Sequence, residues 1–101
     1  MNIYVIGGGA AGIMAAIYAS DKDTQVTILE KNQKIGKKLF ITGKGRCNIT
    51  NFADYEEYFN NIISNKNFLR GALYQMPPYS VIKLLNDNGL ATKVERGGRV
   101  F

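Results

Sequence analysis

Three glycines near the start of the chain have the spacing of a phosphate-binding turn, since Gly7, Gly9 and Gly12 read G-x-G-x-x-G. In such a turn the first glycine permits a tight bend, the second lets a pyrophosphate approach the backbone, and the third allows a helix to pack closely on a strand. The N–H groups of Ala10 and Ala11 lie where the positive end of a helix dipole attracts phosphate. We therefore expect these five residues to bind the pyrophosphate of a dinucleotide.

A carboxylate completes this pattern, because Glu30 follows Gly12 by 18 residues. An acidic residue at about this distance accepts hydrogen bonds from the hydroxyls of an adenosine ribose. It also repels a 2′-phosphate, which disfavours NADP at this site. The carboxylate does not distinguish NAD from FAD, since both contain an adenosine with free ribose hydroxyls.

These groups need a strand–helix–strand unit to hold them, and the hydrophobic pattern predicts one. Residues 2–6 are apolar and β-branched, residues 10–20 carry apolar and small side chains at helical spacing, and residues 25–30 predict a second strand. A unit of this kind makes a parallel, right-handed connection. The predicted fold class is therefore α/β, with a Rossmann-type βαβ unit that binds FAD or NAD(P).

After the second strand the periodicity is lost, and residues 31–52 are predicted to form a long loop with a short extended piece over residues 38–41. Loops this long in compact domains are usually functional. The remaining pattern predicts short helices followed by the start of a β-hairpin: helices over 54–61, over 68–75 with Asn67 as N-cap, and from Pro77-Pro78 to Asn88-Gly89; a strand over 90–95; a turn at Gly97-Gly98; and a return strand from Arg99.

The positive charge of the chain is local. The net charge is +5, and six of the 13 basic residues lie between Lys31 and Arg46 with no acidic residue among them. A charge run is most often a solvated face. The alternatives are a surface around a bound polyanion such as a pyrophosphate, and a nucleic-acid footprint. Phe40 is the one aromatic residue of this segment, which argues against single-strand binding by stacking. We expect no nucleic acid as partner.

The composition excludes several classes of site. The 101 residues contain one cysteine and no histidine, which excludes an internal disulfide, the usual zinc sites and Ser-His or Cys-His nucleophile pairs. No apolar run approaches the ~20 residues of a membrane span, and residues 1–20 lack the basic start of a signal peptide. We therefore expect a cytoplasmic protein without a membrane partner. The length is short for a complete dinucleotide enzyme, so we expect a fragment of one.

A ten-residue signature lies in the middle of the chain. Residues 42–51 read T-G-K-G-R-C-N-I-T-N, and Gly36-Lys37-Lys38-Leu39 precedes them. This segment resembles the T-G-x-G-R-C-N-x-T-N signature of a family of bacterial flavoproteins, the BaiN-like or aminoacetone-oxidase-like NAD(P)/FAD-dependent oxidoreductases. The resemblance extends from Gly7 to the closing residues 93–101. It implies that residues 1–101 form the N-terminal part of an FAD-binding domain, without the substrate domain and the C-terminal part of the FAD domain.

The resemblance also implies roles for individual residues. By position, the three motif glycines hold the FAD pyrophosphate, Glu30 and Lys31 hold the adenosine ribose and its surroundings, and Lys38 neutralises phosphate charge. Five residues of the signature would lie on the flavin side: Thr42, Gly43, Arg46, Cys47 and Asn48. In the full-length enzyme, hydride would pass between a reduced nicotinamide, NAD(P)H, or a small-molecule substrate and an acceptor. No residue is predicted to be a catalytic acid or base.

Two alternatives stay open at this point. The same fold would serve as the NAD-binding half of a dehydrogenase, and the basic segment would serve a non-enzymatic binding module. Cys47 follows Arg46, whose charge favours a thiolate, but the chain has no second cysteine for a dithiol relay with a flavin. The simpler interpretation is that Cys47 packs beneath the cofactor.

Overall fold

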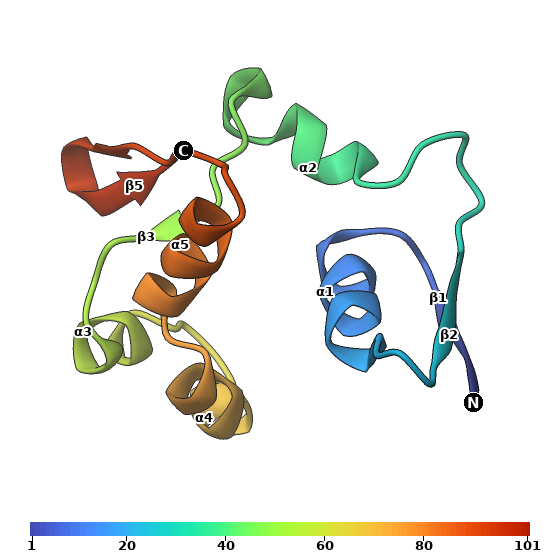
Figure 1. Cartoon of the computed structure of the whole chain (residues 1–101). Coiled ribbons are helices and arrows are strands. Elements are labelled where there is room, and N and C mark those ends of the chain that lie inside the picture. The colour runs from blue at the N-terminus through green and yellow to red at the C-terminus, as the bar shows by residue number, and fades with distance from the viewer. The chain divides into compact units, whose positions relative to one another are not determined.

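A computed structural model describes all residues, 1–101, and divides them into two compact units, Met1–Cys47 and Asn48–Phe101. Figure 1 labels the helices and strands of both units. Each unit is built from short elements, and the longest helices have ten residues. No helix of the structure has the length and apolar character that crossing a bilayer requires.

The first unit begins with the predicted strand–helix–strand arrangement. Strand β1 covers Asn2–Ile6, helix α1 covers Ala10–Ala19 and strand β2 covers Gln25–Leu29. The two strands are parallel and pair in register along their whole length. Helix α1 packs on this sheet, with Ala16 buried against it, because small side chains allow a close approach. The prediction of a Rossmann-type βαβ unit is confirmed.

The predicted extended piece over residues 38–41 is wrong, because this segment is helical. Helix α2 covers Lys37–Ile41, and a 3-10 turn, η1, follows over Thr42–Gly45. Gly36 enters the helix in the left-handed region at φ +69°, and its carbonyl accepts a hydrogen bond from Phe40 N–H at 3.0 Å. A left-handed residue reverses the chain at this point, so the apolar run continues as one helical turn instead of as a strand.

Three helices form about half of the second unit. Helix α3 covers Tyr55–Asn60, α4 covers Lys66–Gln75 and α5 covers Pro78–Asp87. The α3 N-terminus is capped by Asp54, whose side chain accepts a hydrogen bond from Glu57 N–H at 2.8 Å. The predicted N-cap of α4 is wrong, because the helix starts earlier and its N-cap is Asn65. Asn65 lies at φ +52°, a left-handed conformation that asparagine tolerates better than most residues.

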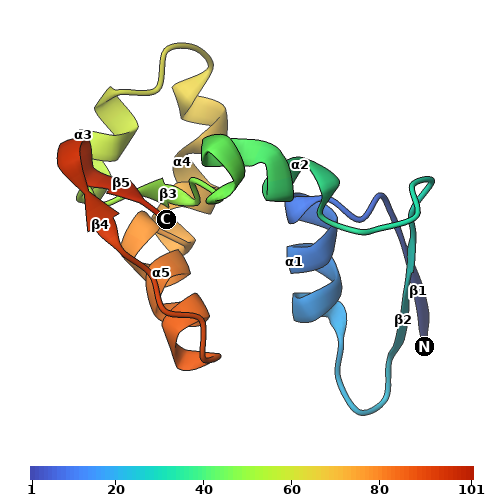
Figure 2. The same ribbon diagram turned by 90° about the horizontal axis from the view of Figure 1, so that it is seen from above.

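A small antiparallel sheet closes the second unit. Strands β3 (Thr50–Asn51), β5 (Arg99–Val100) and β4 (Val94–Glu95) pair in the order β3-β5-β4. The 3-10 turn η2, Arg96–Gly98, joins β4 to β5, so the predicted hairpin is confirmed, although its first strand is shorter than the predicted 90–95. Strand β3 was not predicted, and it lies within the predicted loop. Figure 2 shows these three strands together on one side of the second unit.

The buried core is small in both units. Val100 is fully buried, and Phe59, Ala16 and Pro78 are also buried. Phe59 stacks on Tyr55 with ring centroids 5.7 Å apart, and the Arg70 guanidinium lies 4.7 Å from the Phe59 ring centroid. In the first unit, the sheet face with Tyr4 and Ile6 is exposed, whereas parallel sheets are ordinarily covered on both faces.

Candidate nucleotide-binding site

The turn between β1 and α1 has a geometry that only glycine allows at two positions. Gly7 adopts φ +95° and donates its N–H to Leu29 O at 2.8 Å, which extends the parallel ladder by one residue. A Cβ on Gly12 would overlap the carbonyl oxygen of Gly7. By contrast, a Cβ on Gly9 would meet no atom within 4 Å. The first and third glycines of the motif are therefore required by the fold, whereas the second leaves open space beside the backbone.

The N-terminus of α1 presents donors without an internal partner. The first hydrogen bond of the helix runs from Ile13 N–H to Gly9 O at 2.9 Å, so the N–H groups of Ala10, Ala11 and Gly12 precede the helical ladder. The first turn contains no acidic side chain that would neutralise the helix dipole. This end of the helix therefore suits an anion such as a phosphate.

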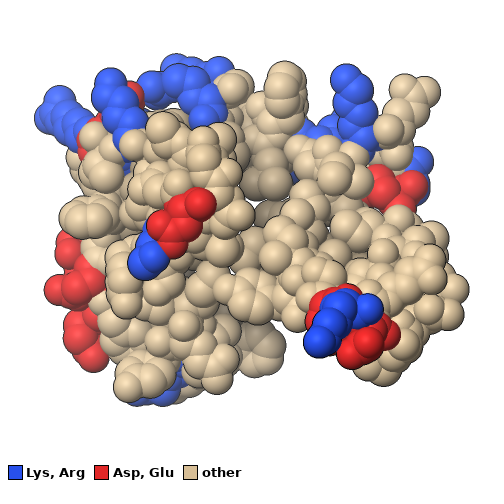
Figure 3. All heavy atoms as spheres, viewed as in Figure 1, with Lys and Arg blue, Asp and Glu red and all other residues tan.

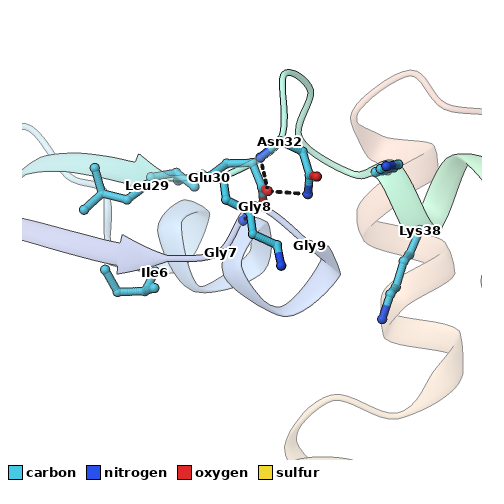
Figure 4. Close-up of a pocket in the computed structure, with 11 residues that line it drawn as sticks. Ile6, Gly7, Gly8, Gly9, Leu29, Glu30, Asn32 and Lys38 are labelled. Atoms are coloured by element: carbon cyan, nitrogen blue, oxygen red, sulfur yellow. Dashed lines mark hydrogen bonds between the residues drawn. The ribbon is translucent and has the colours of Figure 1, made fainter.

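The carboxylate of Glu30 lies at this turn, as predicted, and three N–H groups bind it. Gly8 N–H donates to Oε2 at 2.7 Å, and Asn32 donates to Oε1 through its backbone N–H at 2.8 Å and its Nδ2 at 2.7 Å. Figure 4 shows Glu30 and Asn32 facing each other beside the glycine turn. The hydrogen bonds from the backbone of Asn32 and then of Gly8 lower the pKa of Glu30, so the carboxylate is held in its charged form.

A pocket of about 730 Å³ lies beside these groups, a size typical of small-ligand sites. It brings together five of the residues predicted to bind the cofactor: Gly7, Gly9, Glu30, Lys31 and Lys38. Asn32 and Lys37 also line it and were not predicted. Asn32 follows Glu30 by two residues, and a short polar side chain at that spacing often binds its neighbours, which is the signal that identifies it in retrospect.

The loop after Glu30 is fixed against the glycine turn. Gly36 N–H donates to Gly8 O at 2.7 Å, and a Cβ on the buried Gly8 would lie 2.6 Å from Ile35 Cγ2. This contact places the start of α2 at the pocket, which Lys37 and Lys38 line. Figure 4 labels Lys38 on this helix. The pocket therefore combines the backbone of the glycine turn, one carboxylate and lysine side chains on a single folded unit, whereas the predicted binding residues Ala10, Ala11 and Gly12 do not line it.

The signature residues lie outside this pocket. Residues 42–47 form a left-handed turn closed by hydrogen bonds from Cys47 N–H to Thr42 O at 3.0 Å and from Arg46 N–H to Gly43 O at 3.2 Å. Lys44 and Cys47 adopt positive φ, which costs energy for residues with a Cβ and is found most often at functional sites. Asn48 belongs to the second unit. The flavin-side role of these residues stays a prediction.

The basic segment of residues 31–46 is solvent-facing. All six of its lysine and arginine side chains are exposed, and Figure 3 shows basic side chains projecting from several separate places on the visible face. Lys31, Lys37 and Lys38 line the pocket with the glycine turn, whereas Lys34 does not. Half of the local positive charge thus lies at a site suited to phosphate.

Comparison with known proteins identifies the family. The model of the HI0933-like protein Rossmann domain matches residues 1–101. The chain belongs to this HI0933-like family. The resemblance to BaiN-like flavoproteins and the Rossmann fold predicted from the sequence are therefore confirmed.

The relatives of this HI0933-like chain include enzymes with different substrates. A 3-dehydro-bile acid delta(4,6)-reductase of Clostridium scindens is 44% identical over 102 residues, which cover 99% of this chain and 24% of the relative. Ribosomal RNA dihydrouridine synthases of Escherichia coli and Haemophilus influenzae are 32% and 29% identical over 97 residues, which cover 96% of this chain and 24% of each relative. These relatives are oxidoreductases, and the chain spans about a quarter of their length.

Proposed function

We propose that this chain binds FAD and forms the FAD-binding part of a flavin-dependent oxidoreductase. The observation that carries the proposal is the pocket that joins the open backbone at Gly9 to the charged carboxylate of Glu30, at the turn that leads into the N-terminal donors of α1. The helix amides would bind the pyrophosphate, and Glu30 would accept a hydrogen bond from the adenosine ribose. Lys31 and Lys38 would offset the phosphate charge.

The choice of FAD over NAD rests on the family and not on the pocket. Glu30 accepts the ribose of either cofactor, and the NAD-binding half of a dehydrogenase is the alternative. The signature of residues 42–51 resembles that of flavoproteins, and this favours FAD. We place Thr42, Gly43, Arg46, Cys47 and Asn48 on the flavin side as part of this proposal.

We further propose that the protein reduces a carbon–carbon double bond. A delta(4,6)-reductase and a dihydrouridine synthase, as the relatives are named, both add hydrogen across such a bond. When bound, FAD supplies hydride transfer, with NAD(P)H as the electron donor. The residues of this chain bind and orient the adenosine end, and their N–H groups and lysines compensate the charge of the diphosphate.

We propose a small molecule as the substrate, because the bile acid reductase matches this chain at 44% identity. An RNA uridine is the second candidate, since two relatives are named ribosomal RNA dihydrouridine synthases. The two candidates differ in salt dependence. RNA binding through phosphate contacts weakens steeply as salt increases, whereas binding of a small apolar substrate does not.

Equilibrium titration of FAD into the natural protein that contains this chain, at its full length, tests the proposal. We expect saturable binding at one site and the visible absorption of a bound flavin. NAD should compete weakly, and NADP should compete less than NAD because of the charge on Glu30. Saturable binding of NAD without binding of FAD would replace this proposal with the dehydrogenase alternative.

A further inference from the structure

We propose that Asn32 is a positioning residue for the adenosine ribose, because it fixes the Glu30 carboxylate with one acceptor position left free. This inference rests on the proposed binding of FAD and adds a residue to it. Asn32 is exposed and follows β2 by three residues, so the hydrophobic pattern of the sequence gives no reason to single it out.

The hydrogen bonds to Glu30 leave one acceptor position of its carboxylate free. A carboxylate has about four lone-pair positions, two on each oxygen. Asn32 donates twice to Oε1, from its backbone N–H and from Nδ2, and this uses both positions of that oxygen. Gly8 N–H uses one position of Oε2. One position remains, on the oxygen that is bound to the glycine turn, and a ribose hydroxyl is the donor that we expect there.

Fixing the carboxylate also matters for selectivity. A free glutamate side chain rotates away from an unfavourable ligand at little cost, since its terminal torsion is broad. Glu30 is held at both oxygens by residues before and after it in the chain, so it keeps its charge at the ribose. The side chain of Asn32 thereby supports the repulsion of a 2′-phosphate as well as the binding of a hydroxyl.

The other charged residues that line the pocket with Glu30 are all basic. Lys31 is adjacent and lowers the pKa of Glu30, although less than the hydrogen bonds from Asn32 and Gly8 do. Lys37 and Lys38 line the same pocket, and no second carboxylate does. An acidic side chain in place of Asn32 would therefore be the first like charge at this site.

Asn32→Asp and its control Gln33→Glu test the inference in the full-length natural protein. Both substitutions add one negative charge to the same loop, but Gln33 makes no hydrogen bond to Glu30 and does not line the pocket with the glycine turn. Near neutral pH we expect Asn32→Asp to weaken FAD binding by about tenfold or more, because two carboxylates then face each other. Gln33→Glu should change the affinity by less than about threefold.

The pH profile separates positioning from a general loss of structure. In Asn32→Asp the two carboxylates raise each other's pKa, so a shared proton should restore FAD affinity as the pH falls toward about 5. In Asn32→Ala, the side-chain carbon of Glu30 observed by NMR without FAD should titrate at a higher pH than in the wild type. Gln33→Ala should leave that titration unchanged.

Each result has a defined meaning. Equal FAD affinity and equal pH profiles for Asn32→Asp and Gln33→Glu, with normal wild-type binding, would overturn the role of Asn32 alone. A Glu30 titration unaffected by Asn32→Ala would also overturn it. A wild-type protein that does not bind FAD would instead overturn the proposed function, and the ribose role of Asn32 with it.

Discussion

The backbone N–H of Gly8 donates a 2.7 Å hydrogen bond to Oε2 of Glu30, and the two residues are 22 positions apart in the chain. This bond joins the turn that precedes α1 to the residue that directly follows β2. The backbone of the glycine turn and the carboxylate of Glu30 are thus held at one place, as the proposed binding of a pyrophosphate and a ribose requires. Preorganisation of this kind lowers the cost of ordering the site when a ligand binds.

The first prediction concerns the charge on Glu30. Because hydrogen bonds lower its pKa in the folded chain, Glu30 contributes stability that is present above its ordinary pKa of 4.5 and is lost as the pH falls through the lower folded value. Glu30→Gln should remove this part of the pH dependence and should weaken FAD binding by about tenfold. Thermal unfolding measured at a series of acidic pH values tests this prediction. The same loss of stability with falling pH in the variant and the wild type would contradict it.

The second prediction separates the structural glycine of the motif from an unconstrained one. Gly12→Ala places a Cβ on the carbonyl oxygen of Gly7, so it should lower the free energy of unfolding by about 2 kcal/mol or more. The control is Gly71→Ala in the middle of α4, where a Cβ meets no atom within 4 Å. That substitution should raise stability by up to about 1 kcal/mol, since alanine is the better helix former. Chemical denaturation measures both, and a Gly12→Ala variant of wild-type stability would refute the close packing.

The third prediction concerns the lysines of the basic segment. Lys38 lines the pocket with the glycine turn and Lys34 does not, although both side chains are exposed. Lys38→Ala should weaken FAD binding about two- to fivefold and reduce its salt dependence, whereas Lys34→Ala should change neither. Titrations at low and high salt compare the two variants. Equal effects of the two substitutions on FAD affinity would contradict a specific role of Lys38, because the basic segment would then act only through its overall charge.

The fourth prediction concerns the second unit. Phe59 is buried and its ring contacts Tyr55 and Arg70, whereas Phe68 is 87% exposed. Phe59→Ala should cost about 3 kcal/mol or more of unfolding free energy, and Phe68→Ala should cost less than about 0.5 kcal/mol. Denaturant titration of both variants measures these losses. Similar losses of unfolding free energy in the two variants would show that Phe59 is not central to the packing of the second unit.

The first unit was predicted well because its signals are local. Apolar strand residues, a glycine turn and a helix of small residues follow one another directly in the sequence. The parallel pairing of β1 with β2 follows from the short helical connection between them. The same locality placed Glu30 at the glycine turn. Backbone geometry requires glycine at fixed positions of the turn, so the spacing of the glycines predicts the turn directly.

The errors occurred where distant residues decide the local structure. The N-cap of helix α2 is Gly36, whose N–H donates to Gly8 O in the glycine turn, and nothing in the apolar run of residues 39–41 indicates that contact. Strand β3 has two residues and pairs with β5 near the other end of the chain. The hydrogen bonds from Asn32 to Glu30 are likewise not predicted by hydrophobic periodicity, because an exposed polar side chain has no periodic pattern to mark it.

The most direct test of FAD binding at the glycine turn is titration of FAD into the wild type and the Gly9→Ala variant of the full-length natural protein, with thermal unfolding of both. A Cβ on Gly9 meets nothing within 4 Å in the chain but occupies the space beside the backbone that a pyrophosphate needs. We predict that unfolding free energy changes by less than about 1 kcal/mol while FAD affinity falls by about tenfold or more. Equal FAD affinity in the two proteins would contradict the account.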